Sequence, residues 1–112
     1  MAYDEDLADR LRAVLRDEDG VREARMFGGL AFLLGGNLAI SASSQGGLLV
    51  RCDPAEAAVH VAVPGVTPFE MRGREMGGWL HVTDEAIPDE QSLERWVAVG
   101  AAYARSLPAK HP

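Results

Sequence analysis

The stretch RMFGGLAFLLGGNLAI, from Arg25 to Ile40, constrains the fold more than any other part of this 112-residue chain. It is strongly apolar, and two Gly-Gly pairs interrupt it. A glycine in a helix interior costs about 1 kcal/mol relative to alanine, so the four glycines within nine positions argue against a buried helix. The stretch therefore predicts two strands, at about Arg25–Leu34 and Leu38–Ser43, joined by a tight turn at GGN. The other pair, Gly28 and Gly29, then falls inside the first strand, where it indicates a bulge or a close approach by another backbone.

Apolar periodicity and turn residues predict the remaining elements. We expect a first helix at about Asp4–Asp17, a strand LLVRC at Leu48–Cys52, and a short helix that Asp53 caps and that stops before Pro64. A hairpin formed by TPFEMRG and GWLHVT follows, with a loop around GREMGG, and a closing helix starts after Asp89 and ends before Pro108.

The predicted order of elements is α-β-β-β-α-β-β-α. Short turns between strands imply antiparallel pairing, and helices gathered on one face of such a sheet make a two-layer domain. We therefore predict an α+β fold, a two-layer sandwich with an antiparallel five-stranded sheet. A single domain spans residues 1–112, with residues 109–112 as a frayed tail.

Composition limits the class of protein. A hydrophobic share of 47% and a charged share of 25% are typical of a folded soluble domain. The single cysteine excludes an internal disulfide, and the acidic start MAYDEDLADR does not resemble a signal peptide, so we expect a cytoplasmic location without a membrane span. The formal net charge of −6 disfavours binding to phosphate backbones unless a local basic patch exists.

The sheet face away from the helices is the first candidate for function. The first strand is apolar on both faces, so this face is expected to carry Phe27, Leu33 and Trp79 beside Arg51, Arg72 and His81. An exposed apolar patch of this kind usually marks a partner surface. Cover by loops or by the tail, and a small-molecule groove, are the two alternatives.

Catalytic, cofactor and metal sites lack specific support in the sequence. No motif surrounds Cys52 that would pair it with His60 or His81 as a nucleophile and base. One cysteine and three scattered histidines do not give metal-ligand spacings, and the glycine pairs match no phosphate-binding pattern. We therefore expect no catalytic residues, no cofactor and no metal. A small-molecule enzyme using Cys52 or His81 is the least favoured alternative.

Three motifs resemble the TfoX/Sxy N-terminal domain family. ARMFGGLAFLLGGNLAI is similar to the strand signature of that family, GREMGGWLHV to its second hairpin, and LERWVAVGAAYARSLP to its closing helix. The positions that match the pattern are Arg25, Met26, Phe27, Gly28, Gly29, Gly73, Arg74, Met76 and Gly77. The resemblance covers about Tyr3 to Pro108 and implies a two-layer α+β domain with an antiparallel sheet.

The resemblance also implies a function. The family is named for bacterial regulators of competence for DNA uptake, thought to act with transcription factors, and it has no established catalytic residues. We expect a non-enzymatic regulatory or interaction domain with a protein partner, or a homodimer formed through the sheet. The namesake regulators carry a second, helical domain after this one, so we expect a stand-alone version. The alternative is a nucleic-acid-associated regulator with a converging arginine patch. The candidate interaction residues are Arg25, Phe27, Arg51, Arg72, Arg74 and Trp79.

Overall fold

The computed structural model describes residues 3–109, apart from the side chain of Met71. Its elements, in chain order, are α1 (Glu5–Val14), β1 (Val21–Met26), β2 (Gly29–Leu34), β3 (Asn37–Ala42), β4 (Leu48–Arg51), the 3₁₀ helix η1 (Pro54–Glu56), α2 (Ala57–His60), β5 (Val66–Met71), β6 (Arg74–Val82), the 3₁₀ helix η2 (Asp84–Ala86) and α3 (Glu90–Ser106).

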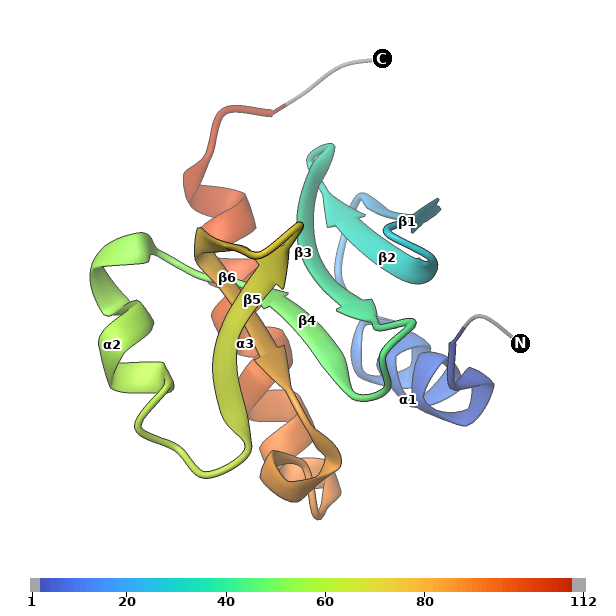
Figure 1. Ribbon diagram of the computed structural model, residues 1–112. Helices are drawn as coiled ribbons and strands as arrows, with labels where there is room; N and C mark the ends of the chain where they lie inside the picture. The colour runs from blue at the N-terminus through green and yellow to red at the C-terminus, as the bar shows by residue number, and fades with distance from the viewer. Residues whose placement is uncertain (1–2, 110–112) are drawn as a thin grey trace.

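The strands form one antiparallel sheet in the order β1-β2-β3-β4-β6-β5. Figure 1 shows this sheet as a bent ribbon, with α3 behind β4 and β6 and with α1 below β3. The α+β class, the antiparallel pairing and the packing of α1 and α3 against the sheet are confirmed. The predicted number of strands is wrong, because the sheet has six strands and not five.

The extra strand is β1, most of which, residues 21–24, lies before the predicted first strand. Its last two residues, Arg25 and Met26, and the whole of β2 fall within the predicted strand Arg25–Leu34. The chain reverses at Phe27 and Gly28, whose φ angles are +55° and +77°, as in a two-residue hairpin turn of type I′. A phenylalanine rarely adopts a positive φ, so the sequence pattern did not indicate a turn there. The other glycine fits the prediction of close approach: a Cβ on Gly29 would lie 2.2 Å from the carbonyl oxygen of Ala42 on β3.

The second hairpin also differs from the prediction. Its turn is at Arg72 and Gly73, with φ angles of +55° and +78°, so most of the predicted loop GREMGG belongs to β6. Gly78 was predicted to lie in this loop, but it lies within β6. Its φ is +79°, and its carbonyl accepts a hydrogen bond of 2.7 Å from the backbone N–H of Cys52, which keeps β6 attached to the end of β4.

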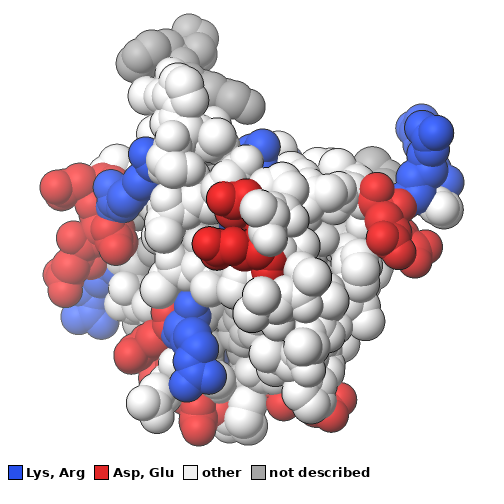
Figure 2. All heavy atoms as spheres, turned by 90° about the vertical axis from the view of Figure 1, so that its left-hand side faces the viewer, with Lys and Arg blue, Asp and Glu red and all other residues white. Residues whose placement is uncertain are grey.

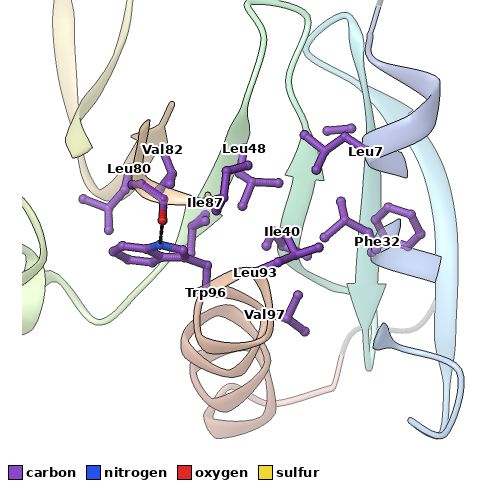
Figure 3. Packing of buried hydrophobic residues seen from close by; sticks show 14 of the residues in the cluster. Leu7, Phe32, Ile40, Leu48, Leu80, Val82, Ile87, Leu93, Trp96 and Val97 are labelled. Carbon is purple, nitrogen blue, oxygen red and sulfur yellow. Dashed lines mark hydrogen bonds between the residues drawn. The ribbon is translucent and has the colours of Figure 1, made fainter. Parts of the chain in front are cut away.

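The hydrophobic core lies between the sheet and the helices. Figure 3 shows Ile40 and Leu48 of the sheet towards Leu93 and Trp96 of α3, and Phe32 on the side of Leu7 of α1. Trp96 is buried, and its indole N–H donates a 3.2 Å hydrogen bond to the carbonyl of Ala86, drawn as a dashed line. These contacts join α3 and η2 to one face of the sheet.

The predicted ends of the two long helices are confirmed to within a few residues. Asp4 caps α1 by accepting from the N–H of Leu7, and Asp89 caps α3 in a capping box with Ser92. The hydrogen bonds from Ser92 hold the pKa of Asp89 below its usual range. Of the predicted frayed tail, residues 110–112 lie outside the described residues. No helix in the described part of the chain has the length and apolar character that crossing a membrane requires.

Candidate interaction surface

One face of the sheet has no helix against it among the described residues, yet its centre is buried. Ala31, Ser41 and Leu49 lie side by side on β2, β3 and β4, and each is at most 2% exposed. Paired residues of neighbouring strands point to the same face, and the residues next to these three in the chain belong to the helix-covered core. Something other than a helix therefore covers this face.

The cover is an aromatic cluster of Phe27, Phe69 and Trp79. The ring of Phe27 lies 6.3 Å from that of Phe69 and 5.8 Å from that of Trp79, edge-to-face in both cases. In a flat sheet β2 and β6 would be three strand spacings, or about 14 Å, apart. The sheet must therefore curl towards this face, which brings the turn between β1 and β2 against β5 and β6. Cover from within the chain, one of the sequence-based alternatives, therefore holds for the centre of the face, but the covering rings come from a turn and two strands and not from the tail.

Phe27 is the exposed member of the cluster. Its side chain is 41% exposed, whereas Phe69 is buried and Trp79 is partly buried. Its left-handed backbone costs a residue of this size about 1–3 kcal/mol, and the hydroxyl of Ser44 helps to hold the turn by donating to the carbonyl of Phe27 at 3.2 Å. Asparagine would fit this turn position better. The strained backbone places an aromatic ring where it is both anchored and accessible.

Arg51 extends the cluster towards α3. Its guanidinium carbon lies 5.1 Å from the centre of the Trp79 ring and 5.4 Å from that of Tyr103. Cation–π contacts of this kind are worth roughly 0.5–1 kcal/mol at exposed sites. Among the described residues Arg51 forms no ion pair with a carboxylate. The edge of its guanidinium can therefore donate to a carboxylate supplied by another molecule.

The predicted interaction residues divide into three places. Phe27, Trp79 and Arg51 come together in the aromatic cluster and its extension. Arg25 pairs with Leu30, which faces the core, so its side chain is on the opposite face of the sheet. Arg72 and Arg74 are exposed at the tip of the β5–β6 hairpin.

The predicted arginine patch therefore does not converge, because Arg25 and Arg51 lie on different faces of the sheet. Figure 2 agrees for the side of the molecule that it draws: the basic side chains stand apart, most of them next to acidic ones. A nucleic-acid groove needs a continuous basic surface. The side drawn in Figure 2 offers none.

Two residues of the site escaped the sequence analysis. Phe69 lies on this face by the ordinary alternation of β5, because it is three residues after Val66, whose side chain belongs to the core. It was passed over because an apolar residue in a predicted hairpin usually has a structural role. Tyr103 belongs to the closing helix, where its position gave no sign of a contact with Arg51. The sequence does contain both residues in positions that could belong to a site, Phe69 beside Pro68 and Tyr103 on a partly exposed face of α3. Residues of these types in such positions usually have structural roles, so neither indicated a site.

Cys52 does not have the environment of a nucleophile. It is 1% exposed, and burial raises the pKa of its thiol, with smaller contributions from Glu56 and Asp53. A reactive cysteine needs the opposite, a lowered pKa and access to solvent. The histidines are also engaged: His81 Nε2 lies 2.8 Å from the carbonyl oxygen of Gly46, and His60 packs edge-to-face on Trp96. Within residues 3–109 no three His, Cys, Asp or Glu side chains are grouped as metal ligands would be.

We expect the Cys52 thiol to react with alkylating reagents far more slowly in the native protein than in urea. Since the folded state disfavours the thiolate, unfolding is favoured once the pH exceeds the thiol pKa of the unfolded chain, about 8.5. The urea midpoint should therefore fall between about pH 8 and pH 9.5, and it should fall less in Cys52→Ala. Equal alkylation rates in the folded and unfolded protein would contradict the burial of Cys52.

Fold and site together define a small two-layer α+β domain with an aromatic cluster on the face that lacks helices. The chain belongs to the TfoX N-terminal domain family, whose model matches residues 13–104. The match includes all six strands and most of α3, so the family resemblance in the sequence is confirmed. No curated protein and no solved structure matches the chain.

Proposed function

We propose that this domain is a non-enzymatic regulatory module that binds another protein through the aromatic cluster of Phe27, Phe69 and Trp79 with Arg51 at its edge. The observation that carries the proposal is the position of Phe27, an exposed ring on a strained backbone that asparagine would adopt with less strain. Membership of the TfoX N-terminal domain family supports a regulatory role of the kind for which the family is named.

The chemistry of the surface suggests what the partner offers. Exposed aromatic residues and arginines are the side chains that most often dominate the energy of protein interfaces. Phe27 would enter an apolar pocket of the partner, while Arg51, held next to the rings of Trp79 and Tyr103, would donate to a partner carboxylate. The partner is therefore expected to present an apolar pocket with an acidic side chain beside it.

Phe27→Asn tests this proposal, because it removes the ring without harming the turn. The variant loses edge-to-face contacts worth about 0.5–1.5 kcal/mol each, and it relieves backbone strain of about 1–3 kcal/mol. We therefore expect the free energy of unfolding to change by less than about 1 kcal/mol in a urea titration. In affinity capture from a lysate of the native cell, proteins retained by the unmodified domain should be lost.

The matched control is Val59→Asn. Val59 is 71% exposed on α2 and is not part of the aromatic cluster, so the variant should capture the same proteins as the unmodified domain. Equal capture by Phe27→Asn and by the unmodified domain would contradict the proposal. Salt-sensitive retention on DNA or RNA, unchanged by Phe27→Asn, would instead point to the nucleic-acid alternative.

A further inference from the structure

The two edges of the sheet differ in their ability to pair with another strand. The β5 edge contains Pro68, which lacks an N–H group, and its register shifts between Pro68 and Glu70. At the other edge, β1 pairs with β2 through six consecutive residues without a shift and contains no proline. Its outer side is therefore a regular row of backbone donors and acceptors that no strand in the described part of the chain occupies.

The turn next to β1 determines which residues direct their backbone groups outwards. Met26 and Gly29 flank the two-residue turn, so they form the hydrogen-bonded pair that closes it. Hydrogen-bonded and non-hydrogen-bonded pairs alternate along an antiparallel ladder, so Ala24 is the next residue of β1 that bonds to β2. Glu23 and Arg25 therefore point their N–H and C=O groups away from the sheet.

We propose that β1 pairs with β1 of a second copy of this chain, antiparallel and about a twofold axis at Ala24, so that two sheets join into one. In this register Glu23 of each copy lies opposite Arg25 of the other copy. The two residues exchange backbone hydrogen bonds, and their side chains pair as opposite charges on the same face. Opposite charges directly across a ladder contribute roughly 0.2–1 kcal/mol for each pair, and like charges are destabilising.

The neighbouring registers are disfavoured by the same charges. Moving the twofold axis to Glu23 places two carboxylates opposite each other, and moving it to Arg25 places two guanidinium groups opposite each other. If the axis lay between two residues, a residue whose N–H and C=O groups point out of the sheet would lie opposite one whose groups already bond to β2. Such a pair cannot form the ladder hydrogen bonds. The charges of the sequence REAR therefore favour one register. At its centre Ala24 lies opposite Ala24 of the second copy, and alanine is small enough for the close approach of a non-hydrogen-bonded pair.

Glu23 is already held in position for this contact. Arg12 of α1 donates to both of its carboxylate oxygens, at 2.8 Å and 2.9 Å, and this pairing lowers the pKa of Glu23. The carboxylate therefore stays ionised and oriented on the helix-covered face, where Arg25 also lies. Arg25 forms no ion pair among the described residues, so it is free to take Glu23 of the second copy.

The test is sedimentation velocity at physiological ionic strength, where charges more than about 8 Å apart are screened, over about 1 µM to about 1 mM protein. The unmodified chain should shift from monomer to dimer as its concentration rises. Arg25→Glu should weaken dimerisation at least about tenfold, because both cross-strand pairs become like-charged. Arg22→Glu is the matched control: it makes the same change of charge on the same strand but lies opposite Met26 of the second copy, so it should dimerise within about threefold of the unmodified chain.

Mixing two variants tests the register itself. Arg25→Glu and Glu23→Arg should each be weak dimers alone, whereas a mixture restores two opposite-charge pairs and should form a heterodimer. Amide hydrogen exchange of the unmodified chain adds a readout that needs no variant: the N–H groups of Glu23 and Arg25 should exchange more slowly at high concentration. A monomer at every concentration, a dimer indifferent to Arg25→Glu, or a mixture that stays monomeric would overturn the proposal.

This inference does not depend on the proposed partner surface. Arg25→Glu should still capture the partner through Phe27, and Phe27→Asn should still dimerise through β1. The two experiments can therefore fail separately. If both succeed, the dimer carries two aromatic clusters and can bind a partner that itself has two sites with increased avidity.

Discussion

Gly100→Ala should destabilise the protein by about 2 kcal/mol or more, although alanine is the better helix former by about 1 kcal/mol. Gly100 lies within α3 where the helix crosses β3, and a Cβ there would stand 2.2 Å from the carbonyl oxygen of Ala39 and 2.9 Å from its carbonyl carbon. Backbone atoms cannot rotate away as a side chain can. The helix would therefore have to move off the sheet, which loosens the contact of Ala101 and Ala104 with Leu34.

Thermal unfolding followed by circular dichroism measures this effect, and about 2 kcal/mol corresponds to a fall in Tm of about 8 °C for a domain of this size. Gly77→Ala is the control, since a Cβ on Gly77 meets no atom within 4 Å and its backbone is not left-handed. That variant should stay within about 0.5 kcal/mol of the unmodified protein. If Gly100→Ala raised Tm instead, helix propensity would dominate and the close packing of α3 on β3 would be refuted.

Trp96→Ala should be among the most destabilising truncations to alanine in the core, at about 3–5 kcal/mol. Trp96 packs in the main cluster, contacts His60 edge-to-face and donates to the carbonyl of Ala86. Its removal leaves a cavity between α3, α2 and the sheet and also leaves the Ala86 carbonyl without its partner. Such a loss is a large fraction of the total stability of about 5–15 kcal/mol that is typical of a domain, so the urea midpoint of the variant should fall steeply.

Urea titration of Trp96→Ala and Trp96→Phe separates packing from hydrogen bonding. Phenylalanine keeps most of the buried surface and loses the donor, so Trp96→Phe should cost about 1–2 kcal/mol. Trp79 is then the only tryptophan in either variant, because the chain has two, and its fluorescence can be excited selectively. A cost below about 1 kcal/mol for Trp96→Ala would mean that α3 does not pack against the sheet as described.

The sequence predicted the parts of the fold that depend on apolar periodicity and helix caps. The α3 cap at Asp89, the closing apolar face and the GGN turn all follow from local chemistry that acts in the same way in any protein. The number of strands was wrong because the turn at Phe27 and Gly28 contradicts the usual preferences for a turn. Phenylalanine has a left-handed backbone there because contacts with Phe69 and Trp79, which are distant in the sequence, offset the strain.

Three residues of the candidate site were predicted from the sequence, but the way in which the strands bring them together was not. Phe27, Trp79 and Arg51 were expected on the face without helices, and the structure brings them together. Arg25 was predicted to lie on the same face as Arg51, because the strand was expected to continue through Phe27 and Gly28. The chain reverses there instead, so Arg25 pairs with Leu30 and its side chain lies on the helix-covered face. Whether these residues bind a partner is the question for the capture experiment.

The reversal of the chain at Phe27 and Gly28 creates β1, forms the β1 edge and places the Phe27 ring over the face without helices. Nuclear Overhauser contacts measured by NMR on the unmodified protein test it directly. We expect contacts from the ring of Phe27 to the rings of Phe69 and Trp79, together with cross-strand contacts between Ala24 and Ala31. An uninterrupted strand from Arg25 to Leu34, with no contact between the rings of Phe27 and Trp79, would contradict it.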